Sequence, residues 1–198
     1  MHQKTAITLN IATAVLLIGM SLPAQADQEE FVVSDFDKDG LVIARGETWE
    51  VWLKGAGDDP TQTCAVSLAE DDALGEAGGT SLRLDYDVDS ENAAYNGARV
   101  ALGGFDASGF KTLSLYVKGD PAAGFTKKLK IELIGETRRP SPYILTGITG
   151  EWQKFTVPLE EFWAVSDWTS LYQFVVVFDD INSDPKTGAI FVDQIVFA

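Results

Sequence analysis

The side chains that could do acid–base or nucleophilic chemistry in this chain are mainly carboxylates. Its 198 residues include 30 Asp and Glu, but one histidine, His2, and one cysteine, Cys64. His2 precedes a predicted cleavage site, so the mature chain would lack the base of a Ser-His-Asp or Cys-His relay and any His-ligated zinc or iron. Cys64 lies in an apolar run, where a buried, unreactive thiol is expected. We therefore expect no enzyme, or one that relies on carboxylates, Lys or Tyr.

One acidic run has the spacing of metal ligands. Asp35-Phe36-Asp37-Lys38-Asp39-Gly40 matches the first half of an EF-hand calcium loop. The twelfth position of that loop, however, is Gly46, and Glu47 comes one place late. The residues before Asp35 have the pattern of a strand, which disfavours a helix-flanked EF-hand. A different calcium site and a solvated acidic turn remain as the two alternatives.

The overall charge restricts the possible partners. Thirty acidic residues against 15 basic ones give a formal net charge of −15 at pH 7. Binding to duplex nucleic acid requires clustered Lys and Arg, so this balance argues against it, and anionic membranes and polyanionic glycans are disfavoured for the same reason. Neutral ligands and divalent cations remain compatible. Solubility alone is the other explanation of the acidic surface.

The first residues have the composition of a signal peptide. Lys4 provides the positive start, residues 6–20 are mostly apolar, and Ala24-Gln25-Ala26 has the small-x-small pattern of a cleavage site. A membrane anchor is the alternative, but the apolar run is short and is interrupted by Thr and Asn. We expect residues 1–26 to be removed after Ala26. Residues 27–198 would then be a single domain in the periplasm or outside the cell.

The rest of the chain has the pattern of an all-β protein. Apolar residues alternate with period two in short runs that Gly, Pro, Asp or Asn separate, and no long segment has the 3.6-residue period of a helix. One short helical turn is expected within 159–168. We predict an antiparallel two-sheet β-sandwich, of the jelly-roll kind, with eleven strands near 31–35, 48–54, 63–69, 80–88, 97–102, 111–118, 128–135, 141–146, 152–158, 171–178 and 189–197.

The alternation also predicts which side chains face away from the core. In 112–118, the residues Leu113, Leu115 and Val117 should point inward and Tyr116 outward. By the same rule 128–133 should place its Leu and Ile residues inward and its Lys and Glu residues outward. The run 174–178 is apolar on both faces and should be a central, covered strand. Several strands thus present charged and aromatic residues on the outer side of a sheet, where a concave surface could bind a ligand.

Several segments form a recognisable series when taken in order. They include Val33-Ser34-Asp35-Phe36-Asp37, Gly46 to Trp49, Tyr95-Asn96-Gly97, Trp152-Gln153-Lys154-Phe155 and Ile190-Phe191-Val192-Asp193-Gln194-Ile195. In this series the chain resembles the galactose-binding-like jelly rolls and in particular the family 11 carbohydrate-binding modules. The complex I intermediate-associated protein family shares that scaffold. The resemblance implies that residues 27–198 form a jelly roll that binds a glycan chain on a concave face. Tyrosines would stack on sugar rings, and Arg or acidic side chains would bind hydroxyl groups.

Carried over by position, the resemblance implies a set of ligand-binding residues and a metal site. Tyr95 and Tyr143 are the expected stacking residues, and the expected polar contacts come from Arg99, Tyr116, Glu132 and Arg138, or from Arg139 in place of Arg138. The two tyrosines Tyr116 and Tyr143 could instead be ordinary sheet residues, and Arg99 and Glu132 a cross-strand ion pair. Related jelly rolls often hold a structural Ca²⁺ between the end of the first strand and an Asp of the last strand. Asp35 or Asp37 together with Asp193 would fit that arrangement.

These patterns leave three hypotheses for function. The leading one is a secreted, non-catalytic protein that binds a neutral polysaccharide such as a β-glucan. The second is a protein-interaction or assembly factor on the same scaffold. The third is a glycoside hydrolase or lyase that uses a carboxylate pair such as Glu132 and Asp85, which would have to lie roughly 5–10 Å apart.

Overall fold

The computed structural model describes residues 30–43, 45–53, 59–70, 73–74 and 79–198. The predicted signal peptide and its cleavage site lie outside these residues. The described part contains eleven strands and one turn of 3₁₀ helix, η1 (Leu159–Glu161), but no helix long and apolar enough to cross a membrane. The strands are β1 (Phe31–Ser34), β2 (Glu50–Leu53), β3 (Thr63–Ala69), β4 (Ser81–Asp87), β5 (Tyr95–Phe105), β6 (Thr112–Gly119), β7 (Lys128–Ile134), β8 (Pro140–Thr146), β9 (Gln153–Pro158), β10 (Leu171–Asp179) and β11 (Thr187–Phe197).

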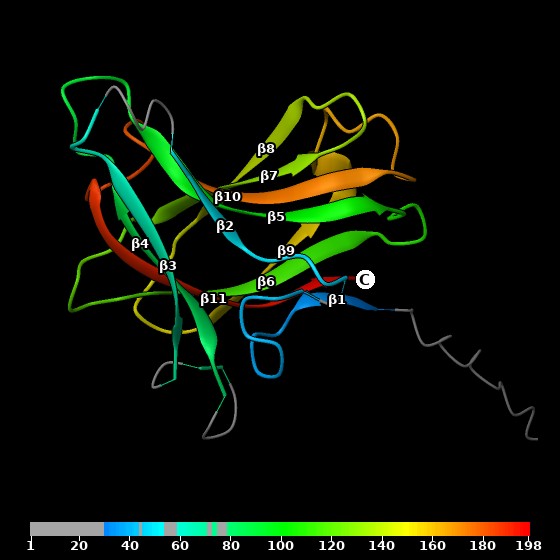
Figure 1. Ribbon diagram of the computed structural model, residues 1–198, viewed down its shortest axis with the longest axis horizontal. Coiled ribbons are helices and arrows are strands. Elements are labelled where there is room, and N and C mark those ends of the chain that lie inside the picture. Colours follow the sequence, from blue (N-terminus) through cyan, green and yellow to red (C-terminus); the bar gives the residue numbers. More distant parts are fainter. Residues whose placement is uncertain (1–29, 44, 54–58, 71–72, 75–78) are drawn as a thin grey trace, which may run out of the picture.

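The strands form two antiparallel sheets that pack face to face (Figure 1). One sheet has the order β3-β4-β11-β6-β9, and β1 is added to it by pairing with β11. The other has the order β2-β5-β10-β7-β8. This is the predicted two-sheet β-sandwich, and each predicted strand is present within a few residues of its expected bounds. The expected helical turn is η1.

The alternation of side chains places the core between the sheets. Leu113, Leu115 and Val117 of β6 are fully buried, as are Leu129, Ile131 and Leu133 of β7. These inward faces are the ones that the period-two pattern predicts. Aromatic side chains join the two sheets: the rings of Tyr86 on β4 and Phe178 on β10 stack with centroids 4.1 Å apart. The core therefore fixes which face of each sheet is left for other contacts.

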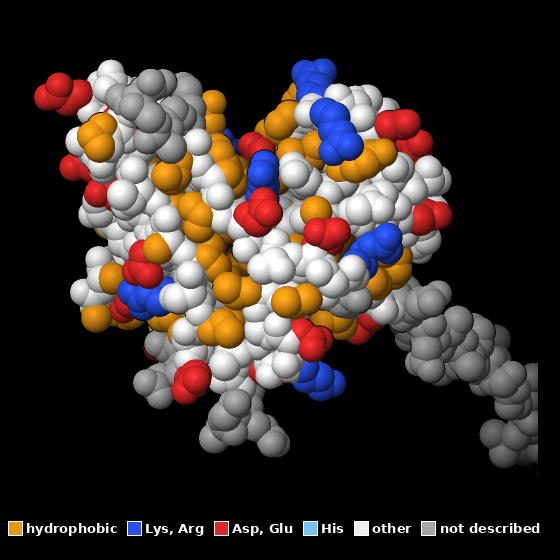
Figure 2. Space-filling view, viewed as in Figure 1, with side chains coloured by type: hydrophobic (Ala, Val, Ile, Leu, Met, Phe, Trp, Pro, Cys, Tyr) orange, Lys and Arg blue, Asp and Glu red, His pale blue; other side chains and the backbone are white. Residues whose placement is uncertain are grey.

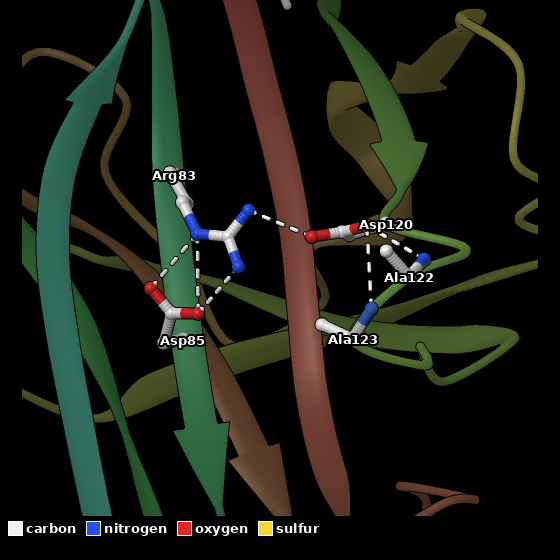
Figure 3. Close-up of polar contacts among 5 residues, drawn as sticks. All are labelled: Arg83, Asp85, Asp120, Ala122 and Ala123. Carbon is white, nitrogen blue, oxygen red and sulfur yellow. Dashed lines mark hydrogen bonds and ion pairs between the residues drawn. The ribbon is translucent and has the colours of Figure 1, made fainter.

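An Arg-centred ion-pair network lies on the outer face of the six-stranded sheet. Arg83 on β4 contacts Asp85 on its own strand at 2.8 Å and reaches across β11 to Asp120 at 2.7 Å (Figure 3). Burial acts to raise the pKa of Asp120, but hydrogen bonds from Arg83 and from the amides of Ala122 and Ala123 outweigh it and lower the pKa. The network connects β4 to the end of β6 over the intervening strand.

Two strands, β4 and β1, pair with β11 on either side of a bulge. β4 pairs with Thr187–Val192 along one edge of β11, and β1 pairs with Ile195–Phe197 further along the same strand. Asp193 and Gln194 lie between these two ladders, where the pairing with β6 shifts register and Gln194 has a φ of 45°. The acidic turn that follows β1 therefore lies beside Asp193.

Candidate functional site

The outer face of the five-stranded sheet holds a groove of about 410 Å³. All five strands line it, and Figure 2 shows the molecule hollowed at this face, between the β2 edge and the β7–β8 edge. The floor includes Val175 and Val177 of the central strand β10. Both residues were expected to lie on a covered strand, and both are buried. On the groove face, the side chains that flank them come from the neighbouring strands that line the groove.

The strand register arranges the groove face in rows. Residues opposite each other in antiparallel strands point to the same face, so each row runs across the sheet from β2 or β5 to β8. The rows are Trp52, Gly97, Val177, Lys130 and Ile144, then Glu50, Arg99, Val175, Glu132 and Pro142, then Ala101, Gln173, Ile134 and Pro140. The surface is thus apolar along its floor and at the β8 edge, with polar groups between.

An aromatic pair forms the β2 side of the groove. The rings of Trp52 and Tyr95 lie with centroids 5.6 Å apart and planes tilted by 56°. Opposite Trp52 on β5 is Gly97, where an added Cβ would lie 1.9 Å from the carbonyl oxygen of Val176. Only glycine lets the backbones of β5 and β10 approach this closely, so Gly97 determines the position of the strand that carries Tyr95 and Arg99.

Glu132 supplies an acceptor at the centre of the groove. It is half-buried, and none of the described residues forms a hydrogen bond or ion pair with its carboxylate. Burial raises its pKa, the nearby charge of Lys130 opposes that increase, and the charge of Asp179 adds to it. Arg99, which lies in the same row beyond Val175, pairs instead with Glu50 at 3.3 Å, so the alternative of an Arg99–Glu132 ion pair is not realised.

A second charged pair closes the Tyr95 end of the groove. The ammonium of Lys130 lies 2.6 Å from the carboxylate of Asp179. Burial acts to raise the pKa of Asp179, but hydrogen bonds from Lys130 and Asn182 outweigh it, and the pKa is lowered. The amide of Ile181 also donates to this carboxylate. Lys130 is therefore fixed by Asp179 and does not neutralise Glu132 directly.

Three of the six expected ligand-binding residues, Tyr95, Arg99 and Glu132, line this groove. Tyr116 does not, because it belongs to β6 of the opposite sheet, where it pairs with Asp193 on β11. Tyr143 does not either. It lies opposite the buried Ile131, so it points to the core side of β8, where it packs 6.1 Å from the ring of Phe162. Arg138 lies beyond the end of the groove, over the ring of Tyr172.

Sequence reasoning missed Trp52, Lys130, Gln173, Ile134 and Pro140 as lining residues. For Lys130 a signal was present, because its outward direction follows from the alternation in 128–133. Trp52 is equally on a predicted strand, but its face depends on the register with β5, which no local pattern specifies. Gln173 follows a bulge opposite β5, and a bulge changes the face of every residue beyond it.

The carboxylate pair suggested for hydrolysis is not assembled. Glu132 is on β7 in the groove, whereas Asp85 is on β4 of the opposite sheet and forms an ion pair with Arg83. That hypothesis for the pair is therefore wrong. Cys64 is only partly buried, not fully buried as expected. Burial, and secondarily the charge of Asp85, raises the pKa of its thiol to about 12, which disfavours the reactive thiolate.

The structure places Asp193 close enough to Asp37 and Asp35 for their charges to act on it. Asp193 is buried and accepts hydrogen bonds from the amides of Leu74 and Gln194. Its pKa is raised to about 6, chiefly by burial and also by the charges of Asp37 and Asp35. Asp37 accepts a hydrogen bond from the amide of Thr80 at 2.8 Å. No helix flanks the acidic turn, so the EF-hand alternative is excluded, and among the described residues no three acidic side chains form a ready cation site.

Comparison with known proteins identifies the fold. No protein-family model matches the sequence, and no curated protein is similar to it in sequence. A family 11 carbohydrate-binding module of a cellulosomal cellulase from Clostridium thermocellum superposes with a TM-score of 0.60 at 14% identity, covering 85% of this chain and 94% of the module. The module from that organism in complex with a β-1,3-1,4-mixed-linked tetrasaccharide gives 0.60 at 15% identity with the same coverage.

Parts of larger enzymes share the fold as well. An arabinose-bound α-L-arabinofuranosidase matches with a TM-score of 0.54 and 16% identity over 86% of this chain but 26% of the enzyme. The chain therefore has the jelly-roll fold of the family 11 carbohydrate-binding modules, which confirms the fold that the sequence resemblance implied. At these identities the likeness establishes the fold alone.

Proposed function

We propose that this protein is a secreted, non-catalytic carbohydrate-binding protein that holds a neutral polysaccharide, such as a β-glucan, in the groove of the five-stranded sheet. The observation that carries the proposal is the combination, in one open groove, of the Trp52–Tyr95 aromatic pair with the carboxylate of Glu132, which has no hydrogen-bond or ion-pair partner among the described residues. The solved modules of this fold, one of them bound to a mixed-linked tetrasaccharide, support the same proposal. The signal-like residues 1–26 support secretion.

The chemistry of the groove suits a neutral sugar chain. A pyranose ring has an apolar C–H face that packs on an aromatic ring, and its hydroxyl groups donate to carboxylates and accept from guanidinium groups. Trp52 and Tyr95 supply the first kind of contact, and Glu132, Arg99 and Gln173 supply the second. The cationic groups Arg99 and Lys130 already have acidic partners. A polyanion would therefore gain little inside the groove.

Affinity electrophoresis in a gel that contains soluble β-glucan tests the proposal. The parent protein should be retarded, and Trp52→Ala and Tyr95→Ala should each weaken binding by about 2 kcal/mol, or roughly thirtyfold, as expected for the loss of an aromatic anchor. Tyr116→Ala is a matched control because it removes the same side chain from the opposite sheet. It should leave the retardation unchanged.

Two results would contradict this proposal. Equal retardation of the parent and both groove variants would place the site elsewhere. A parent that binds no glycan on an array of neutral polysaccharides would favour the alternative of a protein-interaction or assembly factor on the same scaffold.

The acidic turn after β1 supports a second part of the proposal, a structural Ca²⁺ bound by Asp193 with Asp35 or Asp37. Carboxylate oxygens are ligands that Ca²⁺ prefers. The buried carboxylate of Asp193, whose pKa the two neighbouring acids raise, would gain from a cation. Because no three acidic side chains of the described residues are close enough to hold an ion by themselves, backbone carbonyl oxygens or water would have to complete the site.

A further inference from the structure

Two arginines are stacked on aromatic rings at the turn between β7 and β8. The guanidinium of Arg138 lies 3.7 Å from the centre of the Tyr172 ring, and that of Arg139 lies 4.7 Å from the centre of the Trp163 ring. The arginines are consecutive, but their rings come from two other segments, the start of β10 and the loop after η1. Arg138 has a φ of 59°, a left-handed conformation that is uncommon for a side-chain-bearing residue. We name these four residues the arginine patch.

The guanidinium groups of the arginine patch have no acidic partner among the described residues. Arg99 and Arg83, by contrast, each form an ion pair with a carboxylate. Both patch arginines are exposed, and a chain with a net charge of −15 has many acids that could have been placed there. Stacking on a ring holds the plane of a guanidinium while leaving its edge free, and that edge donates two parallel hydrogen bonds to a carboxylate. The patch is therefore preorganised for a planar anion.

The arginine patch continues the groove. Ile134 and Pro140, the residues that flank the turn, line the groove, and so does Gln173, which follows Tyr172 in β10. In Figure 2 basic side chains gather over the β7–β8 end, directly beside the hollow. A chain that lies along the groove and leaves it past Gln173 would reach the two guanidinium groups. Trp163, 63% exposed, adds an aromatic surface next to them.

We infer that the arginine patch binds the carboxylate of a uronic acid unit carried by the same glycan whose neutral part lies in the groove. This inference rests on the proposed function and narrows it, because it specifies an otherwise neutral chain that carries an acidic sugar. Inside the groove a carboxylate meets Glu132 and the already paired Arg99 and Lys130. At the patch it meets two cations that have no acidic partner in the described part of the chain. The acidic unit of the glycan should therefore bind at the arginine patch and not inside the groove.

The test compares two forms of one polymer, so that only the carboxylate differs. The probes are soluble β-glucan and the same β-glucan with a small fraction of its C6 hydroxyl groups oxidised to carboxylates, which converts those glucose units to glucuronate. The parent protein should bind the oxidised form about tenfold more tightly, the gain expected for a charge-assisted pair. The double variant Arg138→Gln/Arg139→Gln should bind both forms equally, at the affinity that the parent has for the neutral form.

Matched variants separate a specific contact from net charge. Lys127→Gln/Lys128→Gln removes the same two charges from exposed positions at the opposite end of β7, and it should keep the preference for the oxidised form. Tyr172→Phe keeps the ring under Arg138 and should keep the preference, whereas Tyr172→Leu removes the stacked ring and should reduce it.

The outcomes distinguish this inference from the proposed function. If the parent binds both forms equally, or the double arginine variant keeps the preference, the arginine patch does not bind uronate while the groove still binds glycan. If the parent binds neither form, both the groove assignment and this inference fail for β-glucan.

Discussion

Glu132 is the residue at which binding and stability make opposite demands. Its carboxylate is half-buried in the groove with no partner among the described residues, and the groups that face it are Lys130 on its own strand, Arg99 on β5 and Asp179 on β10. Burial raises its pKa above the ordinary value of 4.5. The fold therefore favours the protonated form, although an ionised carboxylate is the better acceptor for sugar hydroxyl groups.

The raised pKa of Glu132 predicts the direction of two pH effects. Glycan affinity should fall as the pH decreases through the raised pKa, by about tenfold in total, because the ionised acceptor is lost. The stability that Glu132 contributes in its protonated form is fully present below pH 4.5, and it is lost as the pH rises through the raised pKa of the folded protein. Titration calorimetry with β-glucan and urea unfolding, each repeated from pH 4 to about pH 7, measure the two effects.

Glu132→Gln is the control for both effects. It should bind about tenfold more weakly than the parent at neutral pH, with little dependence on pH, and should be more stable than the parent there. A variant that keeps the pH dependence of the parent protein would show that another group titrates.

The two partners of the Lys130–Asp179 ion pair contribute unequally to the stability of the fold. Asp179 accepts hydrogen bonds from Lys130 and from the turn that follows β10, whereas Lys130 has the one carboxylate partner. Asp179→Ala leaves several donors without an acceptor and should lower the free energy of unfolding by about 2–3 kcal/mol. Lys130→Met leaves Asp179 with its amide donors and should cost about 1 kcal/mol.

Urea unfolding of the two variants measures this difference. Lys128→Met, which changes an exposed residue of the same strand, is the control and should be close to the parent. A larger loss in Lys130→Met than in Asp179→Ala would contradict the assigned roles.

At the scale of the strands, the position of Gly97 is set by contact between neighbouring backbones. A Cβ at this position would overlap the carbonyl oxygen of Val176 on β10. Gly97→Ala should therefore separate β5 from β10 and lower the free energy of unfolding by about 1–3 kcal/mol, as overpacking does. Because Gly97 lies opposite Trp52, the same change should also weaken glycan binding.

Gly109→Ala is the control, since nothing lies within 4 Å of its added Cβ. An unchanged Gly97→Ala variant would show that the two strands can separate at no cost.

The strands and their faces were predictable because each follows from local alternation. Leu113, Leu115 and Val117 needed no knowledge of the neighbouring strands to be assigned to the core. The groove was only partly predictable, because it depends on which strands are neighbours. Tyr143 shows the difference: it is on a predicted strand, but its register opposite Ile131 turns it toward the core and leaves Ile144 on the groove face. The arginine patch likewise joins three segments that are separate in the sequence.

At the scale of the whole molecule, the net charge of −15 acts on every charged ligand before any contact forms. Long-range repulsion of polyanions is screened over about 8 Å at physiological ionic strength. A neutral glycan is not subject to that repulsion, so its affinity should be nearly independent of salt. A divalent cation is attracted by the whole field, which means that a test of calcium binding has to separate a specific site from general charge neutralisation.

The proposed calcium site makes a prediction about the stability of the whole fold, because it would join the turn after β1 to the last strand. A ligand that binds only the native state at a hundred times its Kd adds about 2.7 kcal/mol, which for a protein of this size corresponds to a rise in Tm of roughly 5–10 °C. Thermal melts in excess Ca²⁺ and in chelator should differ by that amount.

Melts in Mg²⁺ at equal ionic strength control for general neutralisation of the acidic surface, and they should lie close to the melts in chelator. Asp193→Asn removes the central ligand while keeping its shape, so its melts should be insensitive to Ca²⁺. Equal shifts with Mg²⁺ and Ca²⁺, or a full Ca²⁺ shift in Asp193→Asn, would show that Asp193 binds no calcium.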